Sequence, residues 1–185
     1  MFKNLSLKVI VFGFIFTFFS SFGQSFFLGI FNTSIRETLS ITHGQFGSIY
    51  ASATLLSSLL LIWVGKKIDD VNIFRFAIYV ILLLSFSCFF FSKISSVAFL
   101  FLAIFLMRFS GQGMMSHTAT TTVSRYFTKS RGRALSICWF GLSSAEFIMP
   151  VLMVFLLSIT TWQNIWTIIA IIILFFLPIA SFFLV

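Results

Sequence analysis

Residues 97–124 read VAFLFLAIFLMRFSGQGMMSHTATTTVS, and Arg108 is the one charged side chain among them. The hydrocarbon core of a bilayer is about 30 Å thick, and a helix needs about 20 mostly apolar residues to cross it. This stretch is long enough and apolar enough to do so. Residues 9–35, 38–65 and 76–92 carry no charge at all. The chain therefore contains several membrane-spanning helices in series.

Residues 134–185 carry a single charge, Glu146, and are too long for one helix. The polar break that divides them consists of Ser158, Thr160, Thr161, Gln163 and Asn164. We therefore predict an all-α membrane protein, one domain over residues 1–185, with six transmembrane helices. Their expected bounds are roughly 8–31, 44–64, 73–92, 96–124, 133–157 and 162–185. The first is not a cleavable signal peptide, because its apolar run exceeds the usual run of about 7–15 residues and five helices follow.

Composition excludes several other classes of protein. Hydrophobic residues make up 59% of the chain and charged residues 9%, whereas a soluble domain carries about 25% charged residues. The net charge is +8, but the basic residues form no stripe with exposed aromatics, so we expect no nucleic-acid partner. Cys88 and Cys138 both lie inside apolar runs and are expected to be small core residues. No group of side chains has the spacing of metal ligands, and we expect neither a metal nor another cofactor.

The distribution of Lys and Arg predicts the orientation. With a cytoplasmic N-terminus, nine basic residues lie inside: Lys3, Lys8, Lys66, Lys67, Arg75, Arg125, Lys129, Arg131 and Arg133. Only Arg36 and Lys93 lie outside, which follows the positive-inside rule. We therefore expect a multi-pass protein of the inner (plasma) membrane with both termini in the cytoplasm. Trp162 and Trp166 are expected at the outer interface, where indole rings are favoured.

Several short motifs occur in order along these helices. Gly65-Lys66-Lys67-Ile68-Asp69-Asp70, followed by Arg75, resembles the cytoplasmic loop signature of the major facilitator superfamily, with Gly65 and Asp69 at matching positions. The segments 108–113 and 131–134 resemble the fourth-helix motif and the basic start of the fifth helix of that family. The segments 39–47 and 162–166 are similar to its usual starts of the second and sixth helices.

This resemblance implies a fold and a function. It implies two inverted three-helix repeats, helices 1–3 and 4–6, in one half of a secondary active transporter that works by alternating access. The expected partners are the lipid bilayer, a small-molecule substrate and a second six-helix half. The chain ends inside its sixth helix, so we expect that half to be missing here. The alternatives are a half-transporter that dimerises and a membrane subunit that does not transport. The cytoplasmic gating loop would consist of Gly65, Asp69, Arg75, Arg131 and Arg133.

Ionisable and polar groups inside apolar spans are costly and point to function. Arg108 shares a helix face with Gln112 and is an anion anchor or a charge relay, or else part of a structural pair. Glu146 is a proton carrier or the partner of Arg108. His117 lies on a face of small residues, which favours a structural hydrogen bond over a role in binding. Gln24 either lines the cavity or joins helices by hydrogen bonds.

Arg108 and Glu146 are expected to meet. Arg108 precedes Arg125 by 17 residues and Glu146 follows Gly132 by 14, which places them about 26 and about 21 Å from the inner surface. We therefore predict an ion pair between the fourth and fifth helices. A basic residue at mid-membrane also favours a small organic anion, such as a carboxylate, as substrate. An intramembrane enzyme is not expected, because the serines near His117 lie with it on one continuous helix.

Overall fold

The structure is a computed structural model that describes residues 2–184, and side chains from residue 6 onward. Every regular element in that part of the chain is a helix. The elements are α1 (Phe2–Ser20), η1 (Ser21–Gly23), α2 (Ser25–Ile30), α3 (Asn32–Leu39), α4 (His43–Val64), η2 (Gly65–Asp69), α5 (Ile73–Phe91), α6 (Val97–Met107), η3 (Arg108–Met115), α7 (Ser116–Tyr126), α8 (Arg131–Leu157) and α9 (Trp162–Leu184).

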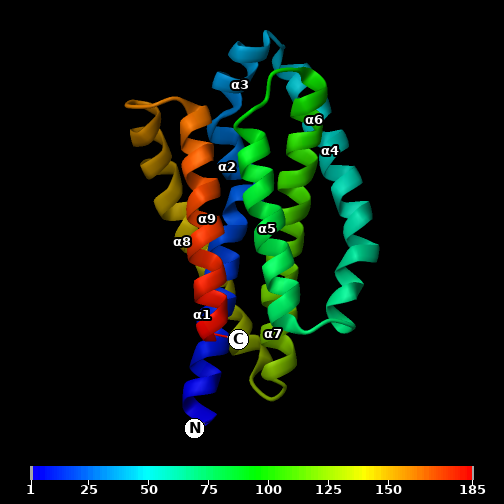
Figure 1. Cartoon of the computed structure of the whole chain (residues 1–185), viewed down its shortest axis with the longest axis vertical. Helices are drawn as coiled ribbons and strands as arrows, with labels where there is room; N and C mark the ends of the chain where they lie inside the picture. Colours follow the sequence, from blue (N-terminus) through cyan, green and yellow to red (C-terminus); the bar gives the residue numbers. More distant parts are fainter. Residues whose placement is uncertain (1, 185) are drawn as a thin grey trace.

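Six of the resulting segments are long and apolar enough to cross a membrane, as the sequence predicts. They are Ser6–Ile30, His43–Asp69, Ile73–Phe91, Val97–Tyr126, Arg131–Leu157 and Trp162–Leu184, the first to sixth spans. The spans run up and down alternately, so both termini, the α4–α5 connection and the α7–α8 connection lie at one end (Figure 1). Helix α3 and the connections α5–α6 and α8–α9 lie at the other end.

The first span is broken, whereas the sequence predicts one continuous helix over residues 8–31. The backbone tightens into the 3₁₀ turn η1 and then becomes extended at Gln24, with φ −82° and ψ 157°, before α2 resumes. The residues around the break are Ser20, Ser21, Gly23 and Ser25. Glycine and serine are weaker helix formers than the leucine found elsewhere in the span. The break therefore falls where the helix propensity of the sequence is low.

The fourth span is also distorted. Between α6 and α7, residues Arg108–Met115 form the π-helical segment η3. Such wide turns are rare and often occur at functional sites. The segment has the sequence RFSGQGMM, with two glycines that let a neighbouring backbone come close. The distortions of the first and fourth spans face each other, because η1 packs against η3.

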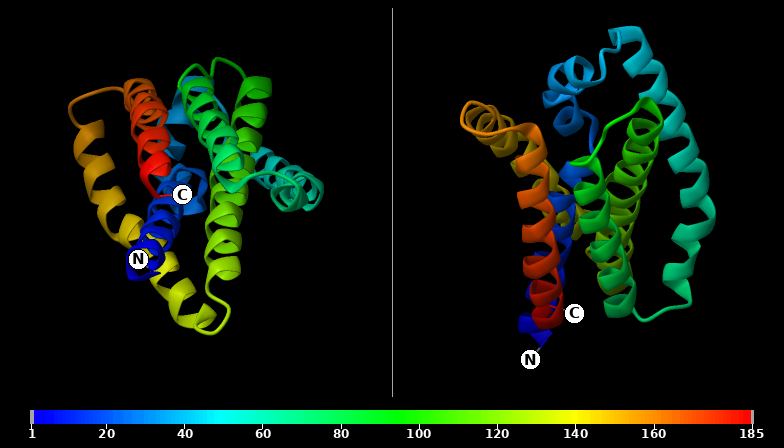
Figure 2. Two further views of the ribbon diagram at one scale, coloured as in Figure 1. Left: turned by 60° about the horizontal axis from the view of Figure 1, so that its bottom comes forward. Right: turned by 45° about the horizontal axis from the view of Figure 1, so that its top comes forward.

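Small residues set the packing of α1 against α8. A Cβ atom added at Gly141 would lie 2.2 Å from the carbonyl oxygen of Phe14, so the two backbones touch there. The hydroxyl of Thr17 donates a hydrogen bond to the carbonyl of Cys138 in the same interface. The other main pairs are α5 with α9, and α4 with α6 and η3. Helices α4 and α8 lie on opposite flanks of the bundle (Figure 2).

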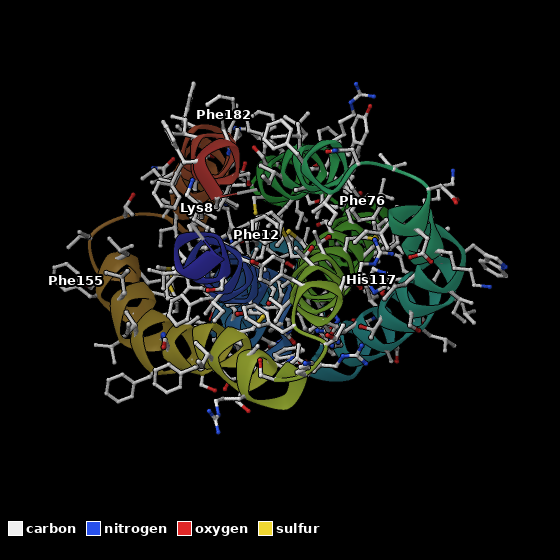
Figure 3. All side chains as sticks on the ribbon, turned by 90° about the horizontal axis from the view of Figure 1, so that it is seen from below. Lys8, Phe12, Phe76, His117, Phe155 and Phe182 are labelled. Atoms are coloured by element: carbon white, nitrogen blue, oxygen red, sulfur yellow. The ribbon has the colours of Figure 1, made fainter. Side chains whose placement is uncertain are left out.

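The bundle has an aromatic interior and an apolar exterior. Phe12 is fully buried between the spans, whereas Phe155 and Phe182 project outward and are 61% and 70% exposed (Figure 3). An exterior of this kind is stable only among lipid chains. The sequence places Trp162 and Trp166 at the outer interface, but they are 5% and 0% exposed and pack inside the bundle against aromatic rings. They are therefore core residues near the start of α9, and their placement at the level of the outer interface stays a prediction.

Candidate functional site

Arg108 lies at the point where the two distorted spans cross. It is the first residue of η3, and its side chain is only 7% exposed. Its Nη1 donates to the carbonyl oxygen of Gly23 at 3.0 Å and to the hydroxyl oxygen of Ser25 at 3.4 Å. Among the described residues, no backbone N–H donates to the carbonyl of Gly23, because the chain turns away from helix at Gln24. The break in the first span therefore supplies the acceptor that holds the guanidinium.

Two glycines make this crossing possible. A Cβ atom at Gly23 would lie 2.4 Å from the carbonyl oxygen of Met107 and 2.8 Å from the Cα of Gly111. A Cβ atom at Gly111 would in turn lie 2.7 Å from the Cα of Gly23. Any side chain at either position would push the spans apart. The resulting backbone contact brings Arg108 within reach of the first span.

Tyr50 of α4 adds a third span to the same cluster. The guanidinium carbon of Arg108 lies 5.3 Å from the centre of the Tyr50 ring, a cation–π distance. The Tyr50 hydroxyl donates to the Ser25 hydroxyl at 3.0 Å. The first, second and fourth spans therefore meet around one positive charge.

A small polar cavity adjoins this cluster. Its volume is about 180 Å³, and its lining consists of Thr54, Ser57, Ser58, Leu61, Arg108, Gln112 and Gly113. Two polar atoms of the lining are buried without a hydrogen-bond partner, Nε of Arg108 and Oγ1 of Thr54. An unpaired buried donor costs roughly 1–3 kcal/mol, and more when it is charged. Arg108 and Gln112, predicted to share a face, do line the same cavity.

The predicted ion pair between Arg108 and Glu146 is absent. Glu146 is exposed on α8 and has no ion-pair partner in the described part of the chain. The guanidinium of Arg108 instead bonds to uncharged acceptors of the first span. Residue counts place the two at similar depth, but depth does not fix the direction in which a helix points a side chain. The predicted pair is therefore wrong, and no carboxylate of the described residues lies within ion-pair distance of Arg108.

The other predicted site residues lie outside this cavity. Nε2 of His117 lies 2.9 Å from the carbonyl oxygen of Gly65, which confirms the structural hydrogen bond favoured by the sequence (Figure 3). Gln24 is half-buried at the break of the first span, beside the cluster but not in the lining of the cavity. Their roles in binding stay predictions.

The cytoplasmic loop signature forms a contact of its own. Asp69 at the end of η2 pairs with Arg125 at the end of α7, and Nη1 of Arg125 donates to the carbonyl of Ile68 at 3.3 Å. Arg75, expected in the same gating loop, does not pair with Asp69. Arg131 and Arg133 are exposed at the start of α8. The ends of the second and fourth spans on the side of the two chain termini are therefore joined by charge and by the His117 contact.

Sequence reasoning missed several residues of these contacts. They are Tyr50, Thr54, Ser57, Ser58 and Arg125. A run of hydroxyl residues in the second span, from Ser48 to Ser58, was the signal available for four of them. No group of three or more His, Cys, Asp or Glu in residues 2–184 is placed to hold a metal ion.

Comparison with known proteins gives one match. A family model described as Major Facilitator Superfamily matches residues 13–185, which is nearly the whole chain. No curated protein matches the chain, and no solved structure does.

Proposed function

Because this chain belongs to the major facilitator superfamily, we propose that it forms one half of a secondary active transporter that carries a small organic anion by alternating access. Members of this superfamily are transporters and not enzymes, and the six spans make the chain a multi-pass membrane protein. The proposal extends this general identity to a class of substrate, a second six-helix half and a mode of action.

One observation carries the choice of an anion. Arg108 is 93% buried at mid-span and has no ion-pair partner among the described residues. It lines a polar cavity, and its Nε has no hydrogen-bond partner. A charge at the centre of a membrane costs about 2.5–3.5 kcal/mol on insertion scales, so it is retained only for a role. An anionic substrate would neutralise it. The orientation with both termini in the cytoplasm of the inner membrane belongs to the same proposal.

Uptake by the natural protein in proteoliposomes tests the proposal. Radiolabelled short carboxylates are compared with a neutral sugar and an organic amine, in the wild type and in Arg108→Met. We expect uptake of a carboxylate that Arg108→Met abolishes. Arg36→Met is the matched control, since Arg36 lies in α3 at the outer end and bonds to Asn32. Carboxylate uptake that survives in Arg108→Met, or transport of the neutral or cationic solute alone, would refute the anion site.

A further inference from the structure

Only one nitrogen of the Arg108 guanidinium, Nη1, makes hydrogen bonds to described residues. Nη1 bonds to Gly23 and Ser25, whereas Nε has no partner and Nη2 makes no hydrogen bond to a described residue. The Nε and Nη2 hydrogens point in parallel from one edge of the planar group. Two parallel donors match the two oxygens of a carboxylate better than they match a single spherical anion.

Tyr50 restricts the orientation of the Arg108 guanidinium. Its ring lies against the guanidinium at 5.3 Å, and its hydroxyl is tied to Ser25, the same side chain that Nη1 contacts. Arg108, Tyr50 and Ser25, from three different spans, therefore contact one another in a closed cluster. An arginine side chain has about 2 kcal/mol of rotamer entropy to lose on fixing. A fixed guanidinium has lost that entropy before the substrate arrives.

We propose that Tyr50 is a positioning residue that holds Arg108 so that its Nε–Nη2 edge binds the substrate carboxylate side-on. The inference rests on the proposed function and deepens it to a short carboxylate. The cavity of about 180 Å³ is small, so it suits a short substrate. Gln112, Ser57 and Ser58 line the same cavity and provide polar groups for the remainder of that substrate.

Kinetic constants of the natural protein in proteoliposomes test the role of Tyr50. Tyr50→Leu removes the ring and should raise KM for the carboxylate by about five- to thirtyfold, the range expected for a partly desolvated cation–π contact, while the maximal rate changes less. Tyr50→Phe keeps the ring and should restore KM to nearly the wild-type value. Tyr50→Met, closer in size, gives a second non-aromatic variant if Tyr50→Leu does not fold. Tyr79→Leu is the control, since Tyr79 is 66% exposed on α5.

Competition by chloride tests the side-on geometry. In the wild type, a short carboxylate should compete for uptake far better than chloride does. Arg108→Lys keeps the charge but not the two-nitrogen edge, so it should reduce that preference, and Tyr50→Leu should reduce it as well. Unchanged KM and unchanged preference in Tyr50→Leu, or equal losses in Tyr50→Leu and Tyr50→Phe, would overturn the inference. If Arg108→Met abolishes uptake at the same time, the proposed function stands and only the role of Tyr50 fails.

Discussion

At the scale of single residues, we expect the ion pair of Asp69 with Arg125 to affect transport much more than stability. The side chains are 64% and 40% exposed, so the pair contributes only about 0–1 kcal/mol to stability. From the family resemblance we expect Asp69 to act as a latch between this half and a second half. Asp69→Ala should therefore leave the melting temperature nearly unchanged but lower uptake by roughly fivefold or more, which corresponds to a coupling free energy of about 1 kcal/mol. Thermal melting and uptake of the natural protein measure the two effects.

Asp70→Ala is the matched control, because Asp70 is the next residue and forms no ion pair in the described part of the chain. It should transport like the wild type. Exchanging the charges in Asp69→Arg with Arg125→Asp restores the local pair but not the orientation of a latch. Recovery of transport by that exchange, or full transport in Asp69→Ala, would show that no latch depends on the Asp69 carboxylate.

Individual residues of the site were predictable only where they break the apolar pattern. Arg108 was found because it is the one charge in its span, and its neighbour Gln112 follows from helical spacing. Tyr50 and Thr54 were not found, because a span tolerates such residues without any function. The pairing of Arg108 with Glu146 failed because residue counts give the depth of a side chain and not its azimuth. The direction of the Arg108 side chain depends on the π-helical segment, which helical spacing does not predict.

At the scale of elements, the contact between α1 and α8 depends on Gly141. A Cβ atom there would lie 2.2 Å from the Phe14 carbonyl and 2.4 Å from the Thr17 hydroxyl oxygen, which the backbones can relieve only by separating. Overpacking of this kind costs about 1–3 kcal/mol. Gly141→Ala should therefore lower the melting temperature and the yield of folded protein, measured by thermal melting in detergent and by gel filtration.

Gly132 provides the control in the same helix. It lies in the first turn of α8, and nothing would lie within 4 Å of an added Cβ atom. Since alanine favours helix over glycine by about 1 kcal/mol, Gly132→Ala should be neutral or slightly stabilising. Equal destabilisation by the two substitutions would mean that α1 and α8 are not in backbone contact.

The elements themselves were largely predictable, because a bilayer forces apolar segments into helices of limited length. The break at Gln24 and the widened turn after Met107 were not. The break at Gln24 leaves the carbonyl of Gly23 without a helical donor, and Arg108 of the facing span supplies one, while Gly23 and Gly111 let the two backbones touch. A distortion stabilised by a distant segment leaves only a weak local trace, here a few serines and glycines.

At the scale of the whole molecule, the fold places both termini and the α4–α5 and α7–α8 connections at one end (Figure 1). Most of the Lys and Arg residues of the chain belong to that end, which the positive-inside rule assigns to the cytoplasm. Single cysteines at Asn4 and Lys129 should therefore be shielded from an impermeant thiol reagent added outside cells, whereas one at Lys93 should react. The native Cys88 and Cys138 are buried, so they should add little background. External labelling at Asn4 would reverse the orientation.

The neighbours of each span accord with an inverted repeat, which stays a prediction. The first span packs on the fifth as the fourth packs on the second, and the third packs on the sixth. If the two three-helix units form one rigid half, alternating access requires a second half to move against it. The cavity at Arg108 would then be one wall of a larger binding site.

Without a second half to move against, residues 1–185 should be insufficient for transport. The polypeptide should insert and fold, since its six spans already bury Arg108 and form the ion pair of Asp69 with Arg125. Purified in detergent and reconstituted, it should show no saturable carboxylate uptake above protein-free liposomes, because nothing moves against it. Co-expression with a second six-helix half should restore uptake, and Arg108→Met should abolish it again. Saturable uptake by residues 1–185 alone would instead show that two copies assemble, with the polar cavities of both facing a shared centre.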